Sequence, residues 1–364
     1  MTSSDSSRAR VEGLDGLRGI AALVVVFTHL QTALGWDKWL PGLFNGYLAV
    51  DIFFILSGYV LALSLRRKMY AIDGKIDDKF NFLGFASQRF IRLYLPFLVA
   101  IFVSLLIRYL ILEPSTCNEL LLTSQAYCTR WLDPFSSGNF FYQLLKITTP
   151  NLNAPTWTLP VELINSLFIP ACMLIYALSP NYLYFMIAMS LSGFIFISIL
   201  PSYFYLFALG VILFFSHKSL KFLEDRKISS IVLIATYLSL LGPVSLQGSL
   251  PILVAPAAIS CIQLAVNDSA WKSFLSRKIF IKIGNLSFAL YLLHWPVFLG
   301  ILPQLASFLN GRLEFSILTA KLISSVISLL LVYTLSILFY LYVDKPSIFL
   351  GRFIRDKISV IGAI

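Results

Sequence analysis

The chain has 364 residues, of which 58% are hydrophobic and 13% are charged, and its mean hydropathy is +0.82. Soluble domains carry about 25% charged residues, so this composition excludes a soluble globular protein and indicates an integral membrane protein. The formal net charge is +10 at pH 7, and the chain holds four cysteines. Four cysteines are too few for the disulfide framework of a small secreted domain.

Apolar runs long enough to cross a bilayer recur along the whole chain and predict an all-α polytopic membrane protein with about ten transmembrane helices. The first run follows a short polar segment and lacks a small-residue cleavage site, so we interpret it as a retained signal anchor. We expect one transmembrane domain over residues 1–346 and a short cytoplasmic tail over residues 347–364. In chain order, the predicted spans cover residues 15–35, 47–65, 84–112, 156–177, 183–200, 203–216, 229–245, 250–266, 284–304 and 316–343.

The basic residues are unevenly distributed between the two sides of this topology. With the N-terminus in the cytoplasm, six of the 28 Lys and Arg residues fall toward the outer side, namely Lys38, Arg108, Arg130, Lys146, Arg312 and Lys321. This positive-inside bias predicts a multi-pass protein of the inner membrane with both termini in the cytoplasm. Topology and contact with anionic lipid therefore explain the basic excess, and we expect no nucleic-acid partner. Cys117 and Cys128 share the longest outer loop, where a single disulfide bond is possible.

Arg18 and His29 both lie within the first apolar run, GLRGIAALVVVFTHL. Ionisable residues inside a membrane span are costly, so each needs a reason to be there. Eleven steps of 100° bring a helix back to within about 20° of its starting face, so the two side chains share one stripe about 16 Å apart along the axis. A cation near one membrane face and a base toward the other predict a bound anionic donor and a reacting atom.

Four more polar residues fall in the outer half of the predicted bundle. Asp51 lies one turn into the second span, Glu162 opens the fourth, and Tyr291 and His294 lie at mid-depth or beyond in the ninth. Together with His29, they predict a site of proton chemistry on the outer side of the membrane.

A second set of charges gathers at the inner side. The segment SQRFIRLYLP places Arg89 and Arg92 three residues apart on one helix face. With Arg18 they predict a cationic mouth that faces the cytoplasm. Planar guanidinium groups bind phosphate oxygens in bidentate geometry, which favours a phosphorylated donor at this end.

These residues also have structural interpretations. The three arginines can be positive-inside anchors whose charged ends reach the interface. The carboxylates can serve polar contacts between helices, and the histidines can be packing residues. The three histidines lie far apart in the sequence and the cysteines do not pair as ligands, so we expect no metal cofactor.

Five segments resemble, in order, the signatures of the membrane acyltransferase family 3: LDGLRGIAALVVVFTH, AVDIFFILSGYVLA, RFIRLYLP, PTWTLPVE and LSFALYLLHWP. The resemblance runs from residue 12 to Pro346. That family includes bacterial O-acetyltransferases of lipopolysaccharide O-antigen, exopolysaccharide and Nod-factor sugars. The resemblance implies an O-acetyltransferase that takes an acetyl group from cytoplasmic acetyl-CoA. The implied acceptor is a hydroxyl of a surface polysaccharide or lipid-linked sugar on the outer side.

The family motifs carry over onto particular residues. Arg18 and His29 match an Arg-x10-His pair, and Arg89 and Arg92 match an Arg-x-x-Arg pair, which implies donor binding by the three arginines. The chain departs from the family where the last span ends, because Asp344-Lys345-Pro346 replaces the more usual Glu-Arg-Pro. Some members carry a C-terminal SGNH-type hydrolase domain, which we do not expect in the 18 residues after Pro346.

A mechanism follows as a hypothesis. His29 takes the proton of the acceptor hydroxyl, while Glu162 or Asp51 holds the imidazole. A covalent acetyl-histidine intermediate is an alternative that the sequence does not separate from this route. Trp157, Tyr291 and His294 are the predicted acceptor-binding residues.

Two rival functions stay open at this stage. A transporter or flippase for a glycan or anion would use Arg18, His29 and Glu162 as a proton relay, although the chain shows no internal repeat of the kind common in such folds. The other rival is an acyltransferase whose acceptor is a lipid or small molecule.

Overall fold

The computed structural model describes residues 3–36, 44–69, 80–111, 140–148, 151–182, 184, 187, 203–215, 225, 227–228, 230–231, 234, 251–267 and 269–361. The regular elements within these ranges are all helices, which confirms the predicted all-α fold. The cysteine pair predicted for the outer loop, Cys117 and Cys128, lies outside the described residues.

Sixteen helical segments are described. The longest are α1 (Ser3–Ala33), α2 (Gly46–Met69), α3 (Phe82–Ile111), α16 (Lys278–Pro296) and α18 (Ile317–Phe339). The shorter α-helices are α6 (Phe140–Leu145), α7 (Thr158–Leu167), α8 (Ile169–Leu178), α10 (Phe204–Phe215), α14 (Pro251–Asn267), α15 (Ser269–Leu275), α17 (Leu302–Gly311) and α19 (Lys345–Ile361). The 3₁₀-helix η1 (Ala154–Trp157) precedes α7, and the π-helical segments η2 (Val297–Ile301) and η3 (Tyr340–Asp344) follow α16 and α18.

Six stretches of the described chain are long and apolar enough to cross a membrane. They coincide with the predicted spans that begin at residues 15, 47, 84, 156, 284 and 316. The spans predicted at 203–216 and 250–266 correspond to shorter apolar helices, α10 and α14. The spans predicted at 183–200 and 229–245 lie mostly outside the described residues, so the total of about ten stays a prediction.

Polar side chains fix where three of the long helices begin. The side-chain oxygen of Asn45 accepts a hydrogen bond from the Leu48 amide at the start of α2, and Asn81 does the same for Gly84 at the start of α3. Ser316 accepts one from the Thr319 amide at the start of α18. These bonds satisfy amide groups that have no partner within a first helical turn.

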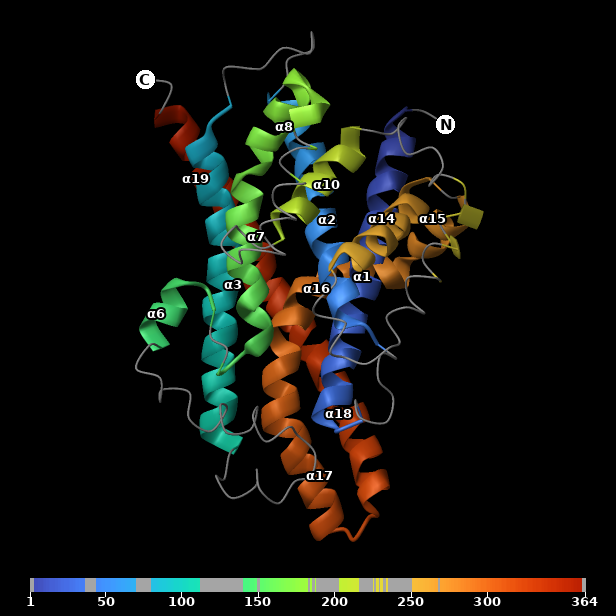
Figure 1. Ribbon diagram of the computed structural model, residues 1–364. Coiled ribbons are helices and arrows are strands. Elements are labelled where there is room, and N and C mark those ends of the chain that lie inside the picture. Colours follow the sequence, from blue (N-terminus) through green and yellow to red (C-terminus); the bar gives the residue numbers. More distant parts are fainter. Residues whose placement is uncertain are drawn as a thin grey trace.

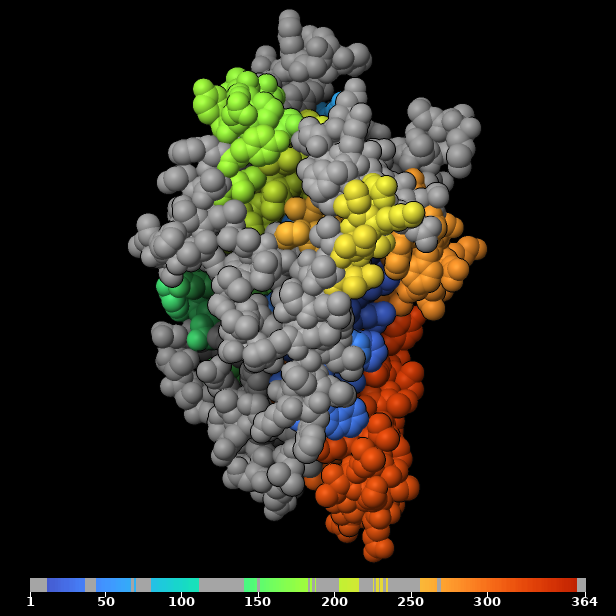
Figure 2. Space-filling model, turned by 45° about the vertical axis from the view of Figure 1, so that its right-hand side comes forward, coloured from blue at the N-terminus to red at the C-terminus, as the bar shows by residue number. Residues whose placement is uncertain are grey.

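The helices form a bundle in which segments distant in sequence lie side by side. α1 packs along α16, α10 along α2, and α19 along α3 (Figure 1). The start of α1 and the end of α19 lie at one end of the bundle (Figure 1). The helices α17 and α18 project together at the opposite end (Figures 1 and 2). The placement of both termini on the cytoplasmic side of the membrane stays a prediction.

The helix that ends the described chain includes most of the segment predicted as a tail. Residues 347–361 belong to α19 and are helical. The side chain of Asn81 donates to the Ile358 carbonyl, and Arg355 donates to Gln88 of α3. This segment is therefore packed against the bundle.

Bulky apolar side chains are exposed on the outside of the bundle. On α3 and α18 they include Phe102, Leu106, Leu110, Leu322 and Leu330. Large exposed apolar surfaces mark contact with another apolar phase, and here they coincide with the long apolar helices. The chain is thus a multi-pass membrane protein whose α3 and α18 face lipid.

Glycines allow α1 and α16 to approach closely. A Cβ atom on Gly284 would lie 2.0 Å from the Asp15 carbonyl oxygen, and one on Gly19 would lie 2.7 Å from the Phe280 carbonyl oxygen. Small residues at helix contacts are typical of membrane bundles, because they let backbones meet. This contact sets the distance between the helices that carry His29 and His294.

We expect Gly284→Ala to destabilise the protein, because its methyl group would force α1 and α16 apart. Overpacking of this kind costs about 1–3 kcal/mol. Gly311→Ala is the matched control, since a Cβ there meets no atom within 4 Å. Thermal unfolding of the two variants in detergent measures the difference, and equal melting temperatures would show that the helix contact adjusts without cost.

Candidate active site

A pocket lies between α1, α2, α3, α7 and α16. Its polar lining includes Arg18, Arg89, Arg92, Glu162 and Tyr291. The structure therefore brings these five predicted site residues together around one space. The other four, His29, Asp51, His294 and Trp157, are not among the residues that line this pocket.

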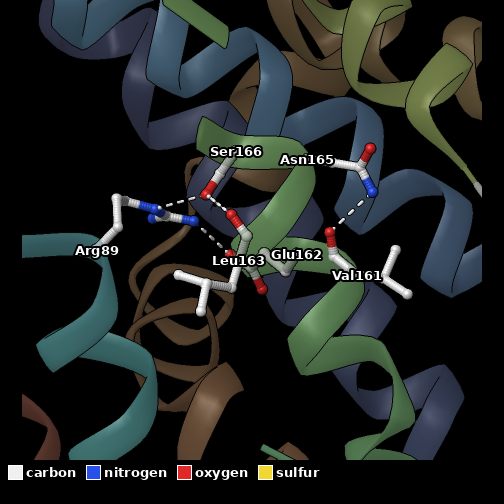
Figure 3. A network of polar contacts seen from close by, with 6 residues as sticks. All are labelled: Arg89, Val161, Glu162, Leu163, Asn165 and Ser166. Carbon is white, nitrogen blue, oxygen red and sulfur yellow. Dashed lines mark hydrogen bonds and ion pairs between the residues drawn. The ribbon is translucent and has the colours of Figure 1, made fainter. Parts of the chain in front are cut away.

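Arg89 is held firmly within a polar network on α7. One of its terminal nitrogens lies 2.9 Å from Glu162 Oε1, and its Nε donates to Ser166 Oγ at 3.2 Å (Figure 3). Ser166 in turn donates to the Leu163 carbonyl. The Arg89 side chain is only 7% exposed. Two residues that lie one and two turns into α7, Glu162 and Ser166, thus balance the charge of this guanidinium and fix its direction.

Arg18 and Arg92 are more open to a ligand than Arg89. The Arg18 side chain is 28% exposed and lies 3.4 Å from Asp15, one turn earlier on α1. Its charge interacts with those of Arg92 and Asp344. The guanidinium of Arg89 is already bonded to Glu162 and Ser166. Arg18 and Arg92 are therefore the main cationic groups that the pocket offers to a ligand.

Asp344 is a site residue that sequence reasoning did not select. It is buried, and its carboxylate interacts with Arg92 and Arg18. It lies in the π-helical segment η3, and such segments are frequent at functional sites. Its place in Asp344-Lys345-Pro346 was the available signal, because that tripeptide occupies the position of the family's Glu-Arg-Pro.

Tyr291 closes the other end of the polar lining. Its hydroxyl lies 2.6 Å from Thr158 Oγ1 and also donates to the Pro155 carbonyl. Asn153 donates to the Leu292 carbonyl at 2.8 Å. These contacts fasten η1 and the start of α7 to α16, which explains why PTWTLPVE and LSFALYLLHWP converge.

His29 and His294 form a hydrogen-bonded pair, with His294 Nε2 2.9 Å from His29 Nδ1. His294 is fully buried, and its Nδ1 lies 2.9 Å from the Leu290 carbonyl. A carbonyl oxygen only accepts, so Nδ1 of His294 carries the proton of that bond. When both rings are neutral, His294 Nε2 accepts from His29 Nδ1–H, and the lone pair of His29 lies on Nε2. The pair thus places the basic lone pair of His29 on Nε2.

Neither of the two predicted carboxylate partners of His29 contacts its imidazole in the part of the chain that the structure describes. Glu162 was expected to hold the imidazole, but it pairs with Arg89. Asp51 was the other expected partner, but its neighbours are Tyr203 and Tyr205. The sequence did not reveal that His294 is the hydrogen-bond partner of His29. The spacing of residues along one helix does not show which side chains of a neighbouring helix they meet. The catalytic roles of Glu162 and Asp51 stay predictions.

The amino-acid sequence that forms this site matches a known protein family. A family profile described as an acyltransferase domain, family 3, matches residues 11–353. This chain belongs to that acyltransferase family. The family membership confirms the resemblance seen in the five sequence segments.

Individual relatives match the chain over shorter stretches. A Rhizobium radiobacter protein named "Protein 2 in picA locus" is 42% identical over 98 residues, which are 27% of this chain and 46% of that protein. A Staphylococcus aureus (strain COL) protein named "Putative O-acetyltransferase" is 30% identical over 166 residues, or 45% of this chain and 24% of that protein. Peptidoglycan O-acetyltransferase OatA of Listeria monocytogenes is 27% identical over 173 residues, or 47% and 25%. The matches thus span less than half the length of these relatives. No solved structure matches the chain.

Proposed function

We propose that this acyltransferase moves an acetyl group from cytoplasmic acetyl-CoA to a hydroxyl of a surface polysaccharide or lipid-linked sugar on the outer side of the inner membrane. The observation that carries the proposal is that the same two helices connect an arginine-lined pocket with a pair of histidines. α1 and α16 border the arginine-lined pocket and also carry the His29–His294 pair. The names of the relatives, O-acetyltransferases among them, support the same reaction.

The pocket suits the chemistry of a CoA thioester. Its cationic end, Arg18 and Arg92, can pair with phosphate oxygens. Its walls are largely apolar and include Val50, Phe53 and Leu61 of α2, which suits an uncharged, chain-like group. On this proposal the phosphates stay at the arginines, and the thioester reaches toward His29 along the stripe of α1.

His29 acts in this mechanism as the general base. Its Nε2 takes the proton of the acceptor hydroxyl as the oxygen attacks the thioester carbonyl carbon. The C–S bond then breaks, and the proton on the imidazolium passes to the departing thiolate of CoA. His294 does not touch the reacting atoms in this scheme. It is a positioning residue that holds the His29 proton on Nδ1.

The test uses membranes that contain the protein, and CoA labelled separately in its acetyl and adenine groups. We expect acetyl label to enter the glycan fraction as a base-labile ester and adenine label to stay out. Movement of unacetylated glycan without either label would contradict the proposal and favour the transporter. Acetyl label in a sugar-free lipid fraction would instead contradict the proposed acceptor.

Substitution of His294 tests the positioning role. We expect His294→Leu to lower the transfer rate about ten- to a hundredfold, by analogy with the loss of partners that orient metal-bound imidazoles. His294→Gln keeps an acceptor for the His29 Nδ1–H, so we expect it to recover part of that loss. The pH profiles of both variants distinguish orientation from folding, since an unconstrained His29 should shift the profile. Equal losses with unchanged profiles would contradict the role.

A further inference from the structure

Asp51 is a buried carboxylate without a visible partner. It is 5% exposed, and no hydrogen bond or ion pair reaches it from the described part of the chain. Its electrostatic neighbours are the phenols of Tyr203 and Tyr205. Buried carboxylates are normally paired or hydrogen-bonded, so such a group calls for an explanation.

Tyr205 adds a second unsatisfied group at the same place. Its hydroxyl is buried and has no hydrogen-bond partner among the described residues. Asp51 can only accept when ionised, whereas the Tyr205 hydroxyl can donate. A ligand with hydroxyl groups can both donate to Asp51 and accept from Tyr205, so it would satisfy both groups.

Tyr203 has an unusual backbone, with a φ of 74°. This left-handed region is uncommon for an aromatic residue, and such strain clusters at binding sites. The conformation presents the Tyr203 ring to Trp157, with ring centroids 5.6 Å apart, and to Phe54 at 5.2 Å. Trp157 remains 37% exposed. An aromatic surface thus lies beside the unpaired polar groups.

The cluster of Asp51, Trp157, Tyr203 and Tyr205 adjoins the pocket at the level of the histidine pair. Phe54 lines the pocket, as does Thr158, the residue after Trp157. Gly46, at the start of α2, packs against Thr28, the residue before His29. The cluster therefore lies toward the end of the bundle that holds the proposed base, away from the arginines.

We propose that Asp51, Trp157, Tyr203 and Tyr205 form the subsite that binds the acceptor sugar. A pyranose ring lies against the aromatic surface of Trp157 and Tyr203. One of its hydroxyls donates to the Asp51 carboxylate, and an oxygen accepts from Tyr205. The single hydroxyl of a simple lipid alcohol is the one that must reach His29, so such an acceptor would leave these groups unpaired, whereas a sugar has further hydroxyls to fill them. Sites built to bind a hydroxyl discriminate strongly against ligands that lack it. This inference rests on the proposed acetyl transfer, and it assigns Asp51 to acceptor binding rather than to contact with His29.

The test is steady-state kinetics of the full-length protein with the deacetylated glycan fraction that wild type labels. We expect Trp157→Ala and Asp51→Asn each to raise the KM for the glycan at least about tenfold while changing the KM for acetyl-CoA less than twofold. Trp157→Phe keeps an aromatic face and should fall between wild type and alanine. Tyr333→Ala, an exposed aromatic of α18, is the matched control and should leave both constants unchanged.

Quenching of Trp fluorescence by the same glycan, without acetyl-CoA, gives a readout that does not depend on catalysis. We expect quenching in wild type, loss of it in Trp157→Ala, and weaker binding in Asp51→Asn. Active variants with unchanged glycan KM and unchanged quenching would overturn the subsite. No labelled glycan with wild type would instead overturn the proposed function on which the subsite rests.

Discussion

Replacing His29 with alanine is expected to lower acetyl transfer about 10²–10⁴-fold, the usual contribution of a general base. In the neutral pair the basic lone pair of His29 lies on Nε2, because its Nδ1 bonds to His294. The loss should appear in kcat, since neither the arginines nor the proposed acceptor groups are altered. Initial rates of ester formation at saturating acetyl-CoA measure the effect.

The control for this variant is a second histidine substitution. His217→Ala removes the third histidine of the chain, which the sequence places among basic residues of a predicted inner loop. We expect it to keep wild-type activity. If His29→Ala were as active as His217→Ala at matched expression, His29 would have only a structural role.

Replacing Arg89 with methionine is expected to have the second large effect. It removes one partner of an ion pair in which Arg89 is 7% exposed and leaves Glu162 without its counter-charge. Breaking a buried pair in this way costs about 3–5 kcal/mol, and we expect the lower end because Glu162 is 26% exposed. Thermal unfolding in detergent measures the loss of stability, and transfer rates should fall with it.

The double variant Arg89→Met, Glu162→Met separates stability from activity. Replacing both partners of a buried pair by apolar residues is often neutral for stability. We therefore expect the melting temperature to recover, while transfer stays low because two polar groups that line the pocket, the Arg89 guanidinium and the Glu162 carboxylate, are gone. Recovery of both properties would show that the pair only holds α3 to α7.

The fold was largely predictable because hydropathy reports directly on membrane-spanning helices. The runs around Arg18, Asp51, Arg89 and Tyr291 all appear as long helices. The relative level of residues along the bundle was also predictable, because it follows from position along a helix, whereas their depth in the membrane stays a prediction. For that reason, the three arginines could be expected at one level and the histidines at another.

Contacts between helices were not predictable in the same way. The sequence placed Glu162 and His29 in the same half of the bundle, but the rotation of each helix decides which side chains meet. That rotation depends on packing, such as the contact of Gly284 with Asp15. Glu162 consequently meets Arg89 and His29 meets His294. The sequence did not single out Tyr203, because the feature that distinguishes it is its backbone conformation and not a motif.

In the proposed mechanism, one site joins a cytoplasmic acetyl donor to an outer sugar hydroxyl through His29. The most direct test of this mechanism places the acceptor glycan inside proteoliposomes and acetyl-labelled CoA outside, with wild-type protein or His29→Ala in the membrane. We expect base-labile label on the enclosed glycan with wild type and none above background with the variant. Equal labelling by both proteins, or labelling only of glycan added on the same side as acetyl-CoA, would contradict it.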